Sequence, residues 1–187
     1  MSEWDAHVYC TCFRDGLTSD PPYPRSDLTV NRFGVVTLTG SNDHAEDPEK
    51  LWCWRVGMTE DGGEAPSPCA HRDMKVVDAI FYWPGSRSYT DRYPVFESCL
   101  ADARLPVLAE LIYRQQADDY PSGGIWVTSS EAAEALTELG ILAERMPADL
   151  PPADAYFART LADLLTASAS TGNPVILHYN GLIDGAW

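Results

Sequence analysis

Basic residues are scarce in this sequence, and long hydrophobic runs are absent. Thirteen lysines and arginines stand against 28 acidic residues, which gives a net charge of −15. Phosphate groups are repelled by such a charge, so we expect neither direct nucleic-acid binding nor attachment to an anionic membrane. No uninterrupted apolar stretch approaches the roughly 20 residues that a membrane-spanning helix requires. We therefore expect a soluble protein.

Two further absences concern the compartment. The first five residues, MSEWD, have neither the basic nor the apolar region of a secretion signal, so we expect the protein to stay in the cytoplasm. An odd number of cysteines in such a chain predicts reduced, mostly buried thiols rather than a disulfide framework. These cysteines are Cys10, Cys12, Cys53, Cys69 and Cys99.

The familiar catalytic signatures are missing as well. The sequence contains no G-x-S-x-G nucleophile elbow, no phosphate-binding glycine loop and no H-E-x-x-H motif. A cysteine nucleophile with His7, His44, His71 or His178 as its base stays open, but so acidic a chain has few residues with which to build the electropositive pocket of a reactive thiolate. We therefore expect a binding protein rather than an enzyme.

The residues from Asp5 to Phe13 have the pattern of a β-strand inside a sheet. Alternate side chains fall on two faces that are both largely apolar, and such a strand is normally covered on both sides. Cys10 and Cys12 then point the same way, with Cα atoms about 6.5 Å apart, as neighbours facing the core rather than disulfide partners.

Local patterns predict the remaining elements. Two β-rich arms around residues 31–34 indicate a hairpin, and residues 74–83 favour a strand. Residues 48–54 fit a short helix, residues 59–68 a loop, and Pro94 and Pro106 each suit the first turn of a helix. Thr128 and Glu131 have capping-box spacing, and Gly140 is placed to end the helix that follows.

The C-terminal part contains the clearest helix, over residues 154–169, followed by a stop at residues 171–174 and a strand over 175–179. Strands at both ends with helices clustered after Pro94 indicate an α+β fold. We predict a single domain over residues 1–187, in which a mainly antiparallel sheet is covered by helices from the second half of the chain.

One group of residues is of the kind that binds zinc. Cys10-Thr11-Cys12 and Cys69-Ala70-His71 together supply three thiols and an imidazole, which is a complete tetrahedral donor set. One residue between the two ligands of each pair is fewer than the two to four of most zinc knuckles. The alternative interpretation is that the cysteines pack as small hydrophobic residues and that the protein has no cofactor.

The excess of acidic over basic residues is uneven, because residues 115–187 contain ten acidic residues against only two basic ones, Arg145 and Arg159. Glu131, Glu134 and Glu138 fall on one side of a predicted helix and form a stripe, which is ordinarily the solvated face of a helix. Aromatic anchors surrounded by carboxylates also suit a basic protein partner. The predicted contact residues are Asp118, Asp119, Trp126, Glu131, Glu134 and Glu138.

Several short motifs resemble a set of poorly characterised bacterial proteins found in toxin-immunity neighbourhoods. They are Cys10–Gly16, Cys69–Met74, Trp83-Pro84-Gly85, Leu105–Leu108 and Gly123-Gly124. The segment from Ser86 to Pro94 departs from that pattern. The resemblance implies an immunity protein, which binds a cognate toxin and has no assigned catalytic residues.

The sequence thus leaves three functions open. The first is a cytoplasmic inhibitor that binds a basic, nucleic-acid-directed toxin through its acidic and aromatic surface. The second is a small metal-binding protein or Cys/His-dependent enzyme that uses Cys10, Cys12, Cys69 and His71. The third is a structural or scaffolding subunit that associates with itself.

Overall fold

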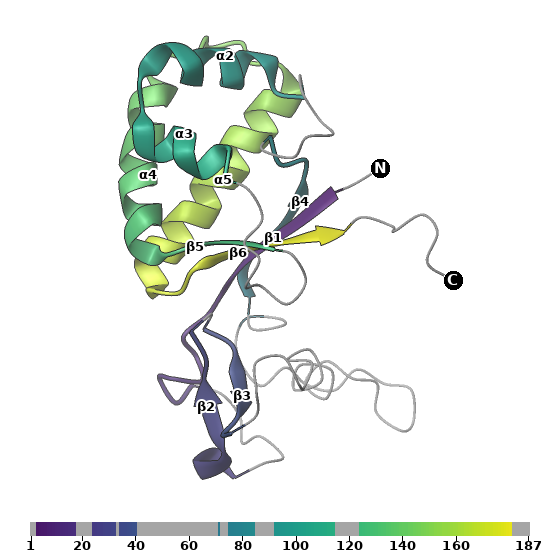
Figure 1. Ribbon diagram of the computed structural model, residues 1–187, viewed down its shortest axis with the longest axis vertical. Helices are drawn as coiled ribbons and strands as arrows, with labels where there is room; N and C mark the ends of the chain where they lie inside the picture. Colours follow the sequence, from purple (N-terminus) through teal and green to yellow (C-terminus); the bar gives the residue numbers. More distant parts are fainter. Residues whose placement is uncertain are drawn as a thin grey trace, which may run out of the picture. The chain divides into compact units, whose positions relative to one another are not determined.

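The computed structural model describes residues 3–17, 24–32, 34–40, 71, 75–84, 92–114 and 124–180. These residues form strands, α-helices and one 3₁₀ helix (Figure 1). In chain order they are β1 (Glu3–Tyr9), η1 (Arg25–Asp27), β2 (Leu28–Val30), β3 (Val36–Leu38), β4 (Lys75–Phe81), α2 (Pro94–Ala103), α3 (Pro106–Ile112), β5 (Ile125–Val127), α4 (Ser129–Ala143), α5 (Pro152–Thr171) and β6 (Val175–Asn180).

The larger sheet has the strand order β4-β1-β6-β5. Strand β6 is antiparallel to both β1 and β5, with Ala6 opposite Leu177 and Trp126 opposite Ile176. The first strand therefore lies inside the sheet, as the sequence predicts, and the C-terminal strand pairs beside it. Strands β2 and β3 form a separate antiparallel hairpin, as predicted, with Thr29 opposite Thr37.

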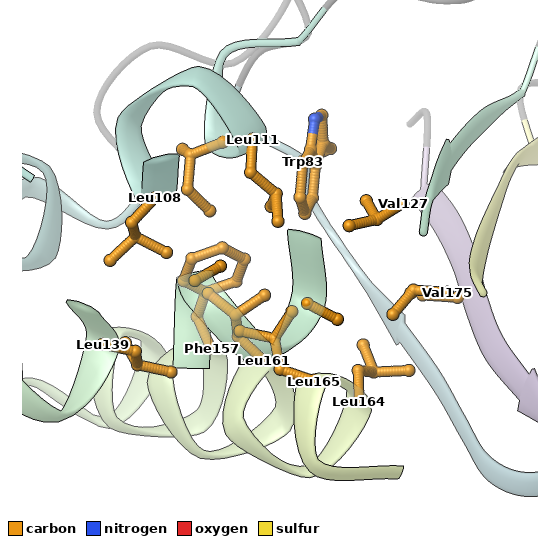
Figure 2. Close-up of a cluster of buried hydrophobic side chains, with 14 of the residues drawn as sticks. Trp83, Leu108, Leu111, Val127, Leu139, Phe157, Leu161, Leu164, Leu165 and Val175 are labelled. Atoms are coloured by element: carbon orange, nitrogen blue, oxygen red, sulfur yellow. The ribbon is translucent and has the colours of Figure 1, made fainter. Parts of the chain in front are cut away.

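Helices α2 to α5 cover one face of the larger sheet (Figure 1). Figure 2 shows the apolar cluster between them, in which Phe157 of α5 lies at the centre. The Phe157 ring stacks on Tyr93 at 4.2 Å and meets Phe96 edge-on at 5.0 Å. Strand residues that face the helices, such as Val127 of β5 and Val175 of β6, belong to the same cluster. The sheet and the helices therefore share one core. The fold class is α+β, as predicted.

Inter-residue contacts divide the chain into two compact units. The first unit, which we call the core unit, contains residues 1–8 and 77–187, and the second, the hairpin unit, contains residues 9–76. The β2–β3 hairpin belongs to the second. That the whole chain behaves as a single domain stays a prediction.

The helix boundaries follow from the residues at their ends. A proline occupies the first turn of α2, α3 and α5, where its missing N–H costs no helical hydrogen bond. Helix α4 begins with the predicted capping box, in which the Thr128 hydroxyl accepts from the Glu131 N–H and the Glu131 carboxylate accepts from the Thr128 N–H. Helix α5 ends at Gly172, whose φ of 75° is left-handed.

Some helix ends are capped by a side chain from a distant part of the chain. The N–H of Phe96 in the first turn of α2 donates to the buried Asp154 carboxylate of α5 at 2.8 Å. At the other end of α2, Arg145 donates to the Ala103 carbonyl oxygen at 3.1 Å. These bonds satisfy backbone groups that have no partner within their own helix.

Two predicted boundaries are wrong. Strand β1 ends at Tyr9 rather than at Phe13, because residues 11–17 curl into a turn. Helix α4 continues through Gly140 to Ala143, and Gly140 does not adopt a left-handed φ. Leu142 is fully buried in the apolar cluster, and its burial offsets the roughly 1 kcal/mol that a glycine costs inside a helix.

The predicted helix over 48–54 and the predicted loop over 59–68 lie outside the described residues. Within the described part of the chain, the structure contains no helix that is long and apolar enough to span a membrane.

Candidate metal centre

The chain turns sharply just after β1, at the first pair of cysteines. The N–H of Asp15 donates to the Thr11 carbonyl oxygen at 2.9 Å, and that of Leu17 donates to the Cys12 carbonyl oxygen at 2.8 Å. The Thr11 hydroxyl also donates to the Asp15 carboxylate. Gly16 completes the turn with a φ of 70°, which glycine adopts without strain. This turn fixes the backbone that holds Cys12.

His71 meets this turn from the far end of the same unit. Its Nδ1 lies 3.3 Å from Sγ of Cys12, although the two residues are 59 positions apart in the sequence. Possible ligand atoms of Cys10, Cys12 and His71 all lie within 4.8 Å of one another. The structure thus brings together three of the four residues that the sequence singles out for zinc, and Cys69 lies outside the described residues.

The spacing of these atoms fits a tetrahedral metal site. Zinc bonds of about 2.3 Å to sulfur and about 2.0 Å to nitrogen place ligand atoms roughly 3.5 to 3.8 Å apart around the ion. Donor atoms that already lie within 4.8 Å of one another need only small shifts to reach that arrangement. Thiolate and imidazole are also the donors that zinc prefers.

The two sulfurs are shielded from solvent, since Cys10 is 5% exposed and Cys12 is 6% exposed. Neither cysteine forms a disulfide with another described residue, and His71 is half-buried. A nucleophilic cysteine must be reached by its substrate, so this burial disfavours a catalytic Cys12–His71 pair. Burial of the sulfurs favours a structural metal site, because the exclusion of water strengthens the attraction between thiolates and a divalent cation.

Two of the three carboxylates in the predicted acidic stripe accept hydrogen bonds within the core unit. Glu131 accepts hydrogen bonds from Thr128 and from Arg114, with an Arg114 Nη2 to Oε1 distance of 2.8 Å. Desolvation raises the pKa of Glu131, but the bonds from Arg114 and Thr128 and the attraction of the guanidinium outweigh it and lower the pKa to about 2. Glu131 is thus a structural residue in this fold.

The other two carboxylates of the stripe have different surroundings. Glu138 is half-buried and accepts from the backbone N–H of Leu108 at 2.7 Å, so it caps the first turn of α3. Glu134 is exposed. Trp126 is half-buried on β5, and Asp118 and Asp119 lie outside the described residues.

Sequence reasoning missed two features of the structure. Arg114 links Glu110, Glu131 and the Trp126 carbonyl oxygen, and the Glu110–Arg114 spacing of four was a local signal for part of this network. A second group of possible ligands, Asp5, His7 and Asp78, lies in the core unit. The alternation of Asp5 and His7 along a strand was its only sequence signal.

Comparisons with protein-family models, with curated proteins and with solved structures find no match to this chain.

Proposed function

We propose that this protein binds a zinc ion through Cys10, Cys12 and His71, and that the ion stabilises the fold of the hairpin unit. The observation that carries the proposal is the convergence of two thiols and an imidazole from sequence positions 59 residues apart. Without an ion, Sγ of Cys12 and Nδ1 of His71 share one weak hydrogen bond. With an ion, the three donors join the two ends of the 9–76 segment.

Cys69 is the fourth donor in this proposal. A Cys₃His set leaves no coordination position for water or substrate, which is the arrangement of structural zinc sites. A site of three protein donors keeps one position open, as catalytic zinc sites do. The burial of Cys10 and Cys12 supports the structural alternative. The absence of a disulfide among the described cysteines also suits a reducing compartment, and we place the protein in the cytoplasm.

The test is the metal content of protein purified without chelator. We expect about one zinc per chain, with most of it lost in Cys12→Ser and in His71→Ala. The matched control is Cys99→Ser, which removes a half-buried thiol of α2 in the core unit and should retain the zinc. Failure of the wild type to retain stoichiometric zinc after equilibration with zinc would refute the proposal, as would equal zinc in Cys12→Ser and Cys99→Ser.

The Cys69→Ser variant separates the two kinds of zinc site. If Cys69 is a ligand, X-ray absorption shows three sulfurs around the ion in the wild type and two in the variant. Two sulfurs in both proteins would leave an open position and would favour the Cys/His-dependent enzyme instead.

A second candidate function is the inhibition of a cognate bacterial toxin, and the charge distribution favours it. Three of the acidic residues in the last 73 positions serve the fold, namely Glu131, Glu138 and Asp154. Glu134 of α4 and Glu144 at the C-cap of this helix are exposed, one before and one after Ile141, which is 41% exposed. An apolar side chain between two carboxylates suits a basic protein surface.

This candidate predicts salt-sensitive binding to a toxin domain encoded next to this chain's gene. Glu134→Lys should weaken that binding at least tenfold at low salt, because a favourable charge becomes a repulsive one. Asp163→Lys, an equal charge reversal on the exposed side of α5, is the control. Equal affinity of both variants would remove the α4 surface from the proposal.

A further inference from the structure

The core unit contains a second group of metal-ligating side chains, on the face of the sheet opposite the helices. In β1, Trp4, Ala6 and Val8 belong to the apolar cluster under the helices. Because successive strand residues point to opposite faces, Asp5 and His7 lie on the other face. The same alternation places Asp78 of β4 there, since its neighbours Val77 and Ala79 pack against the cluster.

Strands β4 and β1 are neighbours in the sheet, so these residues lie side by side (Figure 1). One carboxylate oxygen each of Asp5 and Asp78 and one ring nitrogen of His7 lie within 4.8 Å of one another. Strand β6 pairs with β1 on its other side and places His178 directly opposite Asp5. The rings of His7 and His178 stack with their centroids 5.2 Å apart and 17° between their planes.

We propose that Asp5, His7 and Asp78 form a second cation site, which takes a divalent first-row transition-metal ion such as Mn²⁺ or Fe²⁺. Two carboxylates held this close repel each other, and a divalent cation bound between them would turn that repulsion into attraction. His7 is 2% exposed, so its imidazole is held in place by its surroundings rather than turning freely in solvent. His178 is a positioning residue, because its stacked ring limits the rotation of His7.

The donor atoms select the class of metal. Carboxylate oxygens with one imidazole nitrogen, and no sulfur, disfavour Cu⁺ and are harder than the donors at Cys10 and Cys12. Imidazole is an uncommon ligand for Mg²⁺ and Ca²⁺, which take oxygen. Three protein ligands leave several positions of an octahedral ion open to water or to a small anionic ligand. Because Asp78 is exposed, those positions face solvent.

This site is independent of the zinc centre, since it uses other donors in the other unit. The experiment titrates the full-length protein, loaded with one equivalent of zinc, with Mn²⁺ alone and follows the free aqua ion by electron paramagnetic resonance. We expect one saturable Mn²⁺ per chain. Asp78→Asn should weaken Mn²⁺ binding about tenfold or more, and Asp5→Asn should do the same.

Asp163→Asn is the matched control, because it removes an exposed carboxylate of the same unit without touching the group. Asp78 is exposed, so its replacement leaves the fold intact, and circular dichroism checks this. Absence of saturable Mn²⁺ binding in the wild type would overturn the proposal, as would equal affinities of Asp78→Asn and Asp163→Asn. Zinc content measured on the same samples reports on the cysteine centre separately.

Discussion

Among the described residues, the core unit buries many more apolar side chains than the hairpin unit. The main hydrophobic cluster, from Trp4 to Leu177, lies entirely in the core unit. In the described part of the hairpin unit, the buried apolar residues are only Tyr9, Cys10, Cys12, Leu28, Val35 and Val36. Two of these six are the proposed zinc ligands. Small units with little core usually depend on a disulfide or a metal for their stability. The comparison therefore predicts that the hairpin unit is stabilised mainly by its metal and the core unit mainly by apolar packing.

Metal removal gives the largest expected effect. Chelation should speed amide hydrogen exchange in the β2–β3 hairpin about tenfold or more, which corresponds to ~1.4 kcal/mol of local stability, because the ion no longer joins Cys12 to His71. Exchange in α5 should not change. Mass spectrometry with and without chelator measures both, and one equivalent of zinc should restore the hairpin. Equal acceleration in α5 would contradict the difference between the units.

Glu138→Ala tests how much a side-chain helix cap contributes to the stability of the core unit. The substitution removes the acceptor for the Leu108 N–H, and we expect it to lower the free energy of unfolding by about 1–2 kcal/mol. Glu134→Ala, on the exposed part of the same helix, should change it by less than about 0.5 kcal/mol. Urea unfolding of both variants measures the pair. Similar values would mean that the α3 cap contributes nothing to stability.

The ion pair of Glu131 predicts a pH dependence. The pKa of Glu131 is about 2 in the folded protein and near the ordinary 4.5 when unfolded, so the pair stabilises the fold above pH 4.5 and the effect fades as pH falls towards 2. Wild-type protein should therefore lose its stability advantage over Glu131→Gln as the pH is lowered from 6 to 3. Unfolding free energies at several pH values measure this. A constant difference would exclude Glu131 as the titrating group.

Gly140→Ala gives the smallest expected effect, and it is stabilising. Gly140 lies inside α4 without a left-handed φ, and an added Cβ meets nothing within 4 Å. Alanine should raise the free energy of unfolding by about 0.5–1 kcal/mol. Gly172→Ala is the contrasting variant, because a φ of 75° strains alanine and should cost about 1 kcal/mol. Destabilisation by Gly140→Ala would indicate a close contact at this helix position.

Features that depend on neighbouring residues could be predicted from the sequence. The capping box at Thr128 and Glu131 and the left-handed Gly172 stop are local, and both were found. The position of β1 inside the sheet followed from its two apolar faces, which both have to be covered. Gly140 was misread because the burial of Leu142, which continues the helix, depends on tertiary packing.

The candidate sites could be predicted only in part, because their members meet through the fold. Residue type alone was enough to group Cys12 with His71 across 59 positions. The spacing of Glu131, Glu134 and Glu138 placed them on one side of a helix. It could not reveal that Glu131 binds Arg114 and that Glu138 accepts from the N–H of Leu108. Asp78 joins Asp5 and His7 only because β4 pairs beside β1.

The capping of α2 and α3 by side chains of later helices has a consequence for how this chain assembles. Helices of 10 and 7 residues are too short to persist alone in water, and their first turns are completed by Asp154 and Glu138. The antiparallel neighbours α4 and α5 are close in sequence and can form first. During synthesis, then, α2 and α3 are made before the carboxylates that stabilise them, and they must wait for the C-terminal part of the chain.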